Sequence, residues 1–290
     1  MSAAEALLGR IVDYAGLFPP AALDMATAVR DYQEYLGGEH GWMLGSFVVS
    51  APRLEEFAAA FDQVCCGEKE NPWTLSIVCA GASADDARRI AAFRQGAVFI
   101  GSLEAKAEDP RAAAEVLERL PAARTRYVEF APERAAEMLP VLAERGAWAK
   151  IRMGGLTPGT IPDVESVAHF LAACMRERVP FKATAGLHHA IRATRALTGN
   201  PDGPRAPMHG FLNLFLAAAL AYFGADEPAI LRTLAEEDAS AFSLDDEVIR
   251  WHEQTLITDQ IERVRSEFAM SFGSCSFTDP VDDMKEMGWI

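Results

Sequence analysis

The chain has 290 residues and a mass of 31.5 kDa, which is enough for one large domain or two small ones with a buried core. Half of its residues are hydrophobic and 24% are charged, values close to those of folded globular proteins, which excludes a disordered chain. Its 27 Lys and Arg residues against 42 Asp and Glu residues give a formal net charge of −15. Because this charge repels polyanions, we expect no nucleic-acid partner, although a local group of cations can still bind a small anionic metabolite.

Targeting and cysteine signals are weak throughout the sequence. The first residues lack the basic segment and apolar run of a signal peptide. The longest apolar stretch, residues 211–224, contains Asn213 and is too short to span a bilayer. The five cysteines are odd in number and show no Cys-x-x-Cys spacing, so neither a disulfide framework nor a zinc ribbon is indicated; they are Cys65, Cys66, Cys79, Cys174 and Cys275. We expect a cytoplasmic protein with no membrane partner.

Short β-rich runs alternate with amphipathic segments of helical length along most of the chain. The eight β-rich runs are residues 10–15, 43–50, 73–80, 97–104, 126–131, 147–154, 180–186 and 268–277, and the helical patterns between them are 24–36, 53–64, 84–93, 111–120, 133–143 and 164–176. Such alternation predicts parallel strands joined by right-handed crossovers. Eight units predict an α/β fold, a single (β/α)8 TIM-type barrel domain over residues 1–290. An open doubly wound sheet is the alternative, but it often carries a Gly-x-Gly-x-x-Gly turn that is missing here.

The last repeat is longer than the others. Between strands seven and eight, residues 199–267 are predicted to form a helical insertion, with a Pro/Gly-rich loop at 198–207 and helical patterns at 210–223, 228–237 and 245–265. This insertion begins at the end of the barrel where active sites lie, so it could serve as a lid, as an oligomer surface or simply as structural packing. The apolar helix at 211–223 fits a homodimer interface or the cover of the protein's own core.

Strands six and seven carry cations where buried parallel strands normally carry Val, Ile and Leu. Alternation along a strand places Lys150 and Arg152 on one face of strand six, and Lys182 and Thr184 on one face of strand seven. The opposite faces hold apolar residues, namely Ile151, Met153, Phe181, Ala183 and Ala185. Because an apolar face fits against the helix layer, we expect the cations to point into the barrel.

Buried cations of this kind have a chemical use. A desolvated lysine close to a second cation can lose its proton near pH 7 and attack a carbonyl to form a Schiff base. The alternative is that Glu104 and Glu129, at the ends of strands four and five, neutralise the cations in a structural ion network. Both interpretations can hold together, since a carboxylate between lysines also transfers protons. If Val128 rather than Glu129 faces the lumen, Glu129 has no part in either.

Three motifs resemble those of class I deoxyribose-phosphate aldolases. They are Lys150 on strand six followed by a Gly turn, Lys182 in Lys-Ala-Thr-Ala-Gly on strand seven, and Phe-Gly-Ser-Cys-Ser on strand eight. The resemblance implies a TIM-barrel lyase in which Lys150 forms the imine and Lys182 lowers its pKa. It also implies anion-binding turns at Gly186, Gly273, Ser274 and Ser276.

The sequence departs from that family at several points. Arg152 replaces a small hydroxyl residue of the strand-six motif, the acidic proton-relay residue has no secure counterpart, and the long insertion before strand eight is foreign to the family. A guanidinium can clamp a carboxylate through two parallel hydrogen bonds. Arg152 therefore favours an oxo-acid substrate over a simple aldose phosphate.

Further polar residues follow strands one, seven and eight. His188 is a candidate general acid or base because the ordinary pKa of histidine is near 6.5. The segment from Gly273 to Ser276 offers backbone N–H groups and hydroxyls for an anion, or simply a tight turn, and Asp13 after strand one is a candidate substrate contact. Alternatively, His188, His209 and a carboxylate such as Glu129 hold a divalent metal.

The sequence thus predicts an aldolase-like carbon–carbon lyase that needs no cofactor. A Schiff base on Lys150 or Lys182 would activate a small oxo substrate bearing a carboxylate or phosphate. Arg152 and the strand-eight turn would hold the anion, Thr184 is a further substrate-binding candidate, and Glu104, Glu129 or His188 would move protons. Two alternatives remain open. One is a metal-dependent lyase or hydrolase that uses His188, His209 and a carboxylate, and the other is a non-catalytic barrel that binds an anionic metabolite.

Overall fold

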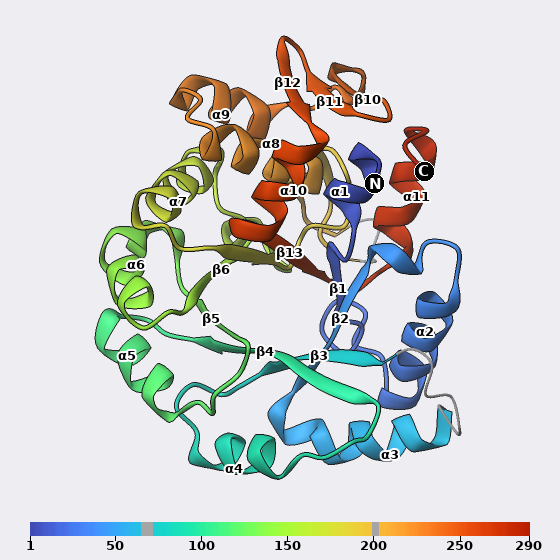
Figure 1. Ribbon diagram of the computed structural model, residues 1–290, viewed down its shortest axis with the longest axis vertical. Helices are drawn as coiled ribbons and strands as arrows, with labels where there is room; N and C mark the ends of the chain where they lie inside the picture. Colours follow the sequence, from blue (N-terminus) through green and yellow to red (C-terminus); the bar gives the residue numbers. More distant parts are fainter. Residues whose placement is uncertain (65–71, 199–202) are drawn as a thin grey trace.

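A closed barrel of eight parallel strands forms the centre of the molecule, in the order β1-β13-β7-β6-β5-β4-β3-β2 (Figure 1). The computed structural model describes residues 1–64, 72–198 and 203–290, so Cys65 and Cys66 lie outside the described residues. The barrel strands are β1 (Val12–Tyr14), β2 (Leu44–Ser50), β3 (Trp73–Val78), β4 (Val98–Lys106), β5 (Thr125–Glu129), β6 (Trp148–Arg152), β7 (Phe181–Thr184) and β13 (Ala269–Ser274). This confirms the predicted (β/α)8 TIM-type barrel.

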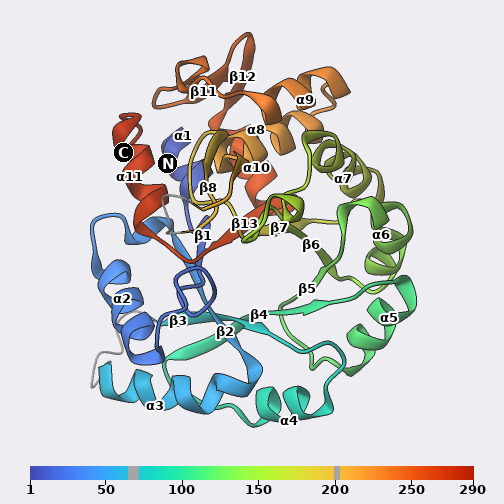
Figure 2. The same ribbon diagram turned by 180° about the vertical axis from the view of Figure 1, so that it is seen from behind.

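Helices surround the barrel on the outside (Figure 2). They are α1 (Ala3–Leu8), α2 (Met25–Gly37), α3 (Leu54–Val64), α4 (Ala84–Ala92), α5 (Pro110–Arg119), α6 (Ala135–Glu144), α7 (Val164–Glu177), α8 (Phe211–Tyr222), α9 (Glu227–Ala235), α10 (Thr258–Glu267) and α11 (Thr278–Glu286). Several begin at an aspartate whose carboxylate accepts a hydrogen bond from a free N–H group of the first turn, as Asp24, Asp109 and Asp163 do. These caps explain why the predicted helix starts are close to those observed.

Strand register decides which side chains share the lumen. Lys150 lies beside Lys182, and Arg152 beside Thr184, in the pairing of β6 with β7. Glu129 lies beside Lys150 in the pairing of β5 with β6, while Val128 is fully buried in the hydrophobic core. Because neighbouring residues of a strand point to opposite faces, Glu129 and not Val128 faces the lumen.

The segment between β7 and β13 contains more strand than the sequence predicted. A hairpin of β8 (Ala193–Ala196) and β9 (Arg205–Met208) occupies part of the expected loop at 198–207, of which residues 199–202 lie outside the described residues. The predicted helix at 245–265 is wrong in its first half, where β11 (Val248–Trp251) and β12 (Gln254–Ile257) form an antiparallel sheet with β10 (Phe242–Leu244). Only α10 in its second half is helical.

The reason lies in a short period-two pattern inside that segment. Ile249 and Trp251 are buried and Arg250 is exposed, the alternation of a strand with one covered face. His252 then takes a left-handed backbone conformation, with a φ of 48°, and turns the chain into β12. A strand of this length is too short for its period to outweigh the helical signal of its neighbours.

The apolar helix α8 packs within the chain itself. Ten of its twelve residues are buried, and Phe211 stacks on Phe272 of β13 with ring centroids 5.1 Å apart. Its hydrophobic sequence is therefore accounted for by the protein's own core, the second of the two interpretations given for residues 211–223. No helix in the described ranges is long and apolar enough to cross a membrane.

Candidate active site

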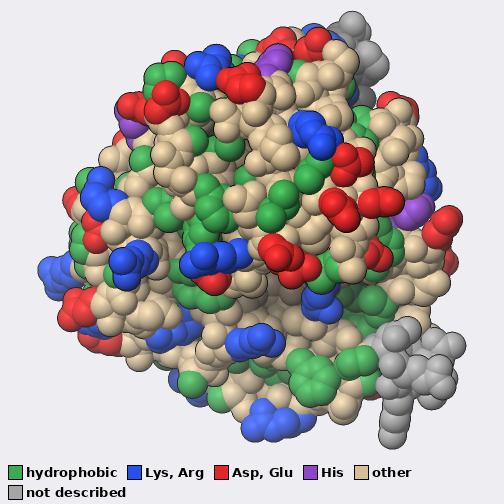
Figure 3. Space-filling view, turned by 45° about the horizontal axis from the view of Figure 1, so that its top comes forward, with side chains coloured by type: hydrophobic (Ala, Val, Ile, Leu, Met, Phe, Trp, Pro, Cys, Tyr) green, Lys and Arg blue, Asp and Glu red, His purple; other side chains and the backbone are tan. Residues whose placement is uncertain are grey.

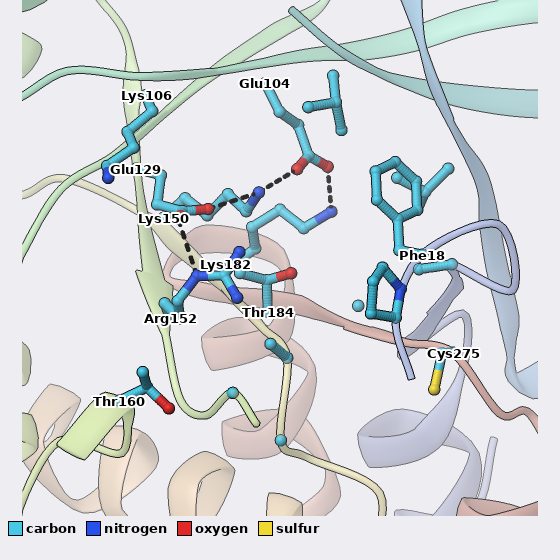
Figure 4. A pocket seen from close by; sticks show the side chains of 18 of the residues that line it. Phe18, Glu104, Lys106, Glu129, Lys150, Arg152, Thr160, Lys182, Thr184 and Cys275 are labelled. Atoms are coloured by element: carbon cyan, nitrogen blue, oxygen red, sulfur yellow. Dashed lines mark hydrogen bonds and ion pairs between the residues drawn. The ribbon is translucent and has the colours of Figure 1, made fainter. Parts of the chain in front are cut away.

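A cavity of about 600 Å³ lies at the carboxyl ends of the barrel strands. One side of it is formed by charged residues of β4, β5, β6 and β7, and the opposite side by Phe18 and by Cys275, from the loops after β1 and β13 (Figure 4). Leu156 and Leu197, from the loops after β6 and β8, complete its apolar wall. Active sites of TIM barrels lie at this end of the fold.

Lys182 occupies the most enclosed position of the charged side. Its Nζ donates to Asp13 Oδ2 at 2.6 Å and to Glu104 Oε1 at 2.7 Å, and its side chain is only 1% exposed. Burial acts to lower the pKa of Lys182, but the charges of Asp13 and Glu104 outweigh it and raise this pKa above its usual range. Lys182 is therefore an ammonium at neutral pH, which differs from the neutral amine that burial near a second cation would produce.

Glu104 joins the two lysines of the lumen. One oxygen, Oε1, accepts from Lys182 and from Ser76 Oγ at 2.5 Å, and the other, Oε2, is 2.7 Å from Lys150 Nζ. Burial acts to raise the pKa of Glu104, but the charges of Lys150 and Lys182 lower it far below the ordinary value. Glu104 is thus held as a carboxylate on both of its oxygens.

Glu129 continues the chain of charges towards the cavity mouth. Its Oε2 is 2.9 Å from Lys150 Nζ, and its Oε1 accepts from Arg152 Nε at 3.1 Å. Burial acts to raise the pKa of Glu129, while Lys150 and Arg152 lower it to below the ordinary value. The Arg152 side chain is 51% exposed, so this last link of the network meets solvent.

The predicted ion network therefore exists, and it alternates in sign from Asp13 through Lys182, Glu104, Lys150 and Glu129 to Arg152. Figure 4 shows its part from Lys182 to Arg152. The network does not use every cation of the cavity. Lys106, two residues after Glu104 on β4, also lines it, and no described residue pairs with its ammonium group.

The cavity has a surplus of positive charge. Four cations line it, Lys106, Lys150, Arg152 and Lys182, and they stand against the lining carboxylates Glu104 and Glu129 and against Asp13, which pairs with Lys182 from outside the cavity lining. The outer surface differs, since acidic and basic side chains are intermixed on the face seen in Figure 3 and the whole chain is acidic. A local excess of one positive charge suits a small anion.

Sequence reasoning missed Lys106 and misplaced Asp13. The predicted fourth strand ended at Glu104, whereas β4 continues to Lys106 and so places both residues on one face. Asp13 was expected to reach a substrate from the segment after strand one, but it lies within β1, inside the predicted run 10–15, where Ser46 N–H and Ser271 Oγ also donate to it. Asp13 is a partner of Lys182 and does not line the cavity.

The predicted anion-binding turns divide into two groups. Thr184, Gly186 and Gly273 line the cavity, as expected of substrate-binding positions. Ser274 and Ser276 do not line it: Ser274 Oγ accepts from Ser276 N–H at 3.2 Å, and Ser276 Oγ accepts from Asp279 N–H at 3.1 Å at the start of α11. The two hydroxyls therefore shape the turn into α11 rather than facing an anion in the cavity.

Gly186 is required where the loops after β6 and β7 meet. Its φ is +73°, and a Cβ added there would lie 2.8 Å from the Cα of Gly154 and 3.0 Å from the carbonyl oxygen of Met153. A side chain at this position would force the two loops apart. The contact fixes the loops that follow Arg152 and Thr184.

His188 stands behind the cavity wall. Its Nε2 is 4.0 Å from Cys275 Sγ, and its Nδ1 is 3.3 Å from Ser274 Oγ and 3.6 Å from Asp279 Oδ2. Burial lowers the pKa of His188 and raises the pKa of the Cys275 thiol. His188 does not line the cavity, so the geometry does not support direct proton transfer between this residue and a ligand.

The three residues of the alternative metal site have separate partners. His209 Nε2 donates to the carbonyl oxygen of Pro162 at 2.8 Å, His188 faces Asp279, and Glu129 is held by Lys150 and Arg152. Across residues 1–64, 72–198 and 203–290, no group of three or more His, Cys, Asp and Glu side chains is placed to hold a metal ion.

No family model and no curated protein sequence matches this chain. The resemblance of its last three barrel strands to class I deoxyribose-phosphate aldolases therefore stays a prediction.

The ion network predicts a pH range of maximal stability. Glu104 and Glu129 have lowered pKa values in the folded protein, so their contribution is present above the unfolded value of about 4.3 and is lost as pH falls below it. Lys182 has a raised pKa, so its contribution is present below the unfolded value of about 10.4 and is lost as pH rises through its folded value. We expect the free energy of unfolding, measured with urea, to be nearly constant from about pH 5 to pH 9 and to fall outside that range.

A Glu104→Gln variant provides the control for the acid side. Its free energy of unfolding should depend less steeply on pH below about pH 4.5, because one titrating carboxylate with a lowered pKa is gone. Equal acid slopes in the variant and the natural protein would contradict the assignment.

Proposed function

We propose that this chain is a carbon–carbon lyase that activates a small carbonyl compound through an imine on Lys150. The observation that carries the proposal is the position of Lys150 Nζ: it lines the cavity, between the carboxylates of Glu104 and Glu129 and next to Lys182. Lys182 is the less suitable nucleophile, because two carboxylates within 2.7 Å and nearly complete burial fix it as a cation.

The remaining charges have complementary roles in this proposal. Lys106 and Arg152, at the outer part of the cavity, are placed to hold a carboxylate or phosphate of the substrate. Lys182 keeps Glu104 ionised, and Glu104 in turn stabilises the positive charge of a protonated imine on Lys150. That imine withdraws electrons from the bond beside the former carbonyl carbon, so the bond can break or form without a metal.

Lys150 must lose a proton before it can attack. Two carboxylates lie within hydrogen-bonding distance of the Lys150 Nζ, and they differ in their capacity to accept a proton. Glu104 is bonded by Lys182 and Ser76 as well, whereas Glu129 has, among the residues that the structure describes, only Arg152 as a second partner. Glu129 is therefore the proton acceptor in the proposed reaction.

Trapping of the imine is the direct test. The protein is incubated with a panel of 2-oxo acids and aldehydes, reduced with borohydride and digested, and the peptides are analysed by mass spectrometry. We expect a reduced adduct on Lys150 for at least one oxo acid, and equal yield in the presence of EDTA. The absence of an adduct on either lysine with every probe would contradict imine chemistry.

A non-catalytic anion-binding barrel is the second candidate. It is favoured by the ion pairs that satisfy Lys150 and Lys182 within the protein itself. For such a protein, added oxo acids would raise the melting temperature, but no adduct and no turnover would be found. The same panel of compounds therefore distinguishes the two functions.

A further inference from the structure

Arg152 has two competing interactions available to it. Its Nε donates to Glu129 Oε1, yet its side chain is half exposed at the cavity wall, which Lys106 also lines with an ammonium that no described residue pairs with. In the pairing of β4 with β5, Lys106 lies beside Glu129, so both cations flank the same carboxylate (Figure 4). A substrate carboxylate entering between them would be a second partner for Arg152.

The loss of Arg152 would change Glu129 in a defined direction. The charged groups that face Glu129 are Lys150 and Arg152 from β6 and Lys106 from β4, with Glu104 across Lys150 and Lys182 beyond it. Of the two cations that bond to it, Arg152 is the one that solvent reaches. Burial acts to raise the pKa of Glu129, so withdrawal of the guanidinium moves this pKa upward.

Arg152 also influences the proton shared by Lys150 and Glu129. It bonds to Glu129 directly and makes no bond to Lys150, so it stabilises the charged form of the pair, ammonium with carboxylate, over the neutral form. Once Arg152 pairs with a substrate anion, their charges cancel and this stabilisation is removed. Transfer of the proton from Lys150 to Glu129 then costs less free energy.

We propose that Arg152 makes imine formation depend on a substrate anion: the substrate carboxylate draws the guanidinium away from Glu129, and the released Glu129 accepts the proton of Lys150. This inference rests on the proposed imine chemistry and assigns the substrate class, a 2-oxo acid whose carboxylate reaches Arg152 and Lys106. Neutral carbonyl compounds of the same size lack the anion that would draw Arg152 away from Glu129.

Glu129 accepts one proton during imine formation and gives it back, so the step balances in protons and atoms. The Lys150 ammonium gives one proton to Glu129, and the amine nitrogen forms a bond to the carbonyl carbon while its second proton moves to the carbonyl oxygen. Glu129 then returns its proton to that hydroxyl, the carbon–oxygen bond breaks and water leaves. The products are a protonated imine and one water, and Glu129 is a carboxylate again.

The test compares pyruvate with methyl pyruvate in the natural protein and in Arg152→Gln. The rate of reductive trapping on Lys150 with cyanoborohydride is measured for each pair, and comparison between proteins cancels the intrinsic reactivity of the two probes. The natural protein should trap the acid faster than the ester. In Arg152→Gln we expect slower trapping of the acid and about tenfold faster trapping of the ester, since loss of one adjacent cation raises the carboxylate pKa by about one unit.

Lys106→Gln is the matched control, because it removes a cavity cation that does not bond to Glu129. This variant should lower the rate at which pyruvate is trapped without raising the rate at which methyl pyruvate is trapped. Faster trapping of the ester should be seen in Arg152→Gln only, and urea unfolding verifies that each variant is folded.

Two results would overturn the inference in different ways. Arg152→Gln could slow trapping of the acid while trapping of the ester stays at or below its rate in the natural protein. In that case Arg152 only binds the anion and does not control the proton. If the natural protein gives no adduct on Lys150 with either probe or with any other oxo acid, the proposed function itself fails. The two failures are therefore separable.

Discussion

Replacing Lys182 by methionine is expected to lower the free energy of unfolding by about 3–5 kcal/mol, the cost of leaving a buried charge without its partner. Lys182 is the sole cation that bonds to Asp13 within the described residues, and it supplies one of the two ammonium groups on Glu104. Both carboxylates are almost fully buried, so water cannot replace the lost ammonium. The effect should be seen in urea unfolding at neutral pH.

Two further variants control this prediction. Lys106→Met removes an exposed lysine from the same cavity that makes no ion pair with any described residue, and it should change the free energy of unfolding by less than about 0.5 kcal/mol. The double variant Lys182→Met with Asp13→Asn should recover part of the loss, because it also removes a stranded charge. If Lys182→Met is no less stable than Lys106→Met, the network does not support the fold.

Lys150→Met is expected to lose reductive trapping entirely and to lower the rate of any turnover found with an oxo acid by at least about a thousandfold, because the nucleophile is gone. Its fold should suffer less than that of Lys182→Met. Glu104 keeps Lys182, and Glu129 keeps Arg152, so neither carboxylate is left without a cation. Stability and activity thus respond differently to the two lysines.

The adduct position provides the decisive measurement for this variant. In the natural protein and in Lys106→Met, the labelled peptide should contain Lys150. A label on Lys182 in the Lys150→Met protein, with turnover retained, would show that the nucleophile has been assigned to the wrong lysine. Thermal unfolding of each variant confirms that a lost label does not reflect a lost fold.

Local periodicity predicted the inward face of β6 and β7, and the structure confirms it for Lys150, Arg152, Lys182 and Thr184. These positions follow from alternation within one strand and the apolar character of the opposite face, which are both local properties. Strand ends are less well defined by sequence. An error of two residues at the end of β4 hid Lys106, although it shares a face with Glu104.

The partners within the network could not be read from the sequence in the same way. Asp13 and Lys182 are 169 residues apart, and they meet because closure of the barrel brings β1 and β7 to either side of β13. The register of those pairings depends on packing around the whole barrel and leaves no local signal. The same holds for the distinct partners of His188 and His209, which lie near each other in sequence but bond to different elements.

The contact between Gly154 and Gly186 limits how this barrel can adapt to other ligands. Two backbones touch there with no side chain between them, so this part of the wall, next to the strand that carries the guanidinium, has no group to trim or enlarge. The opposite wall carries a replaceable side chain, Phe18. Selection or engineering for bulkier compounds should therefore change residues around Phe18 first, while the glycine pair stays fixed.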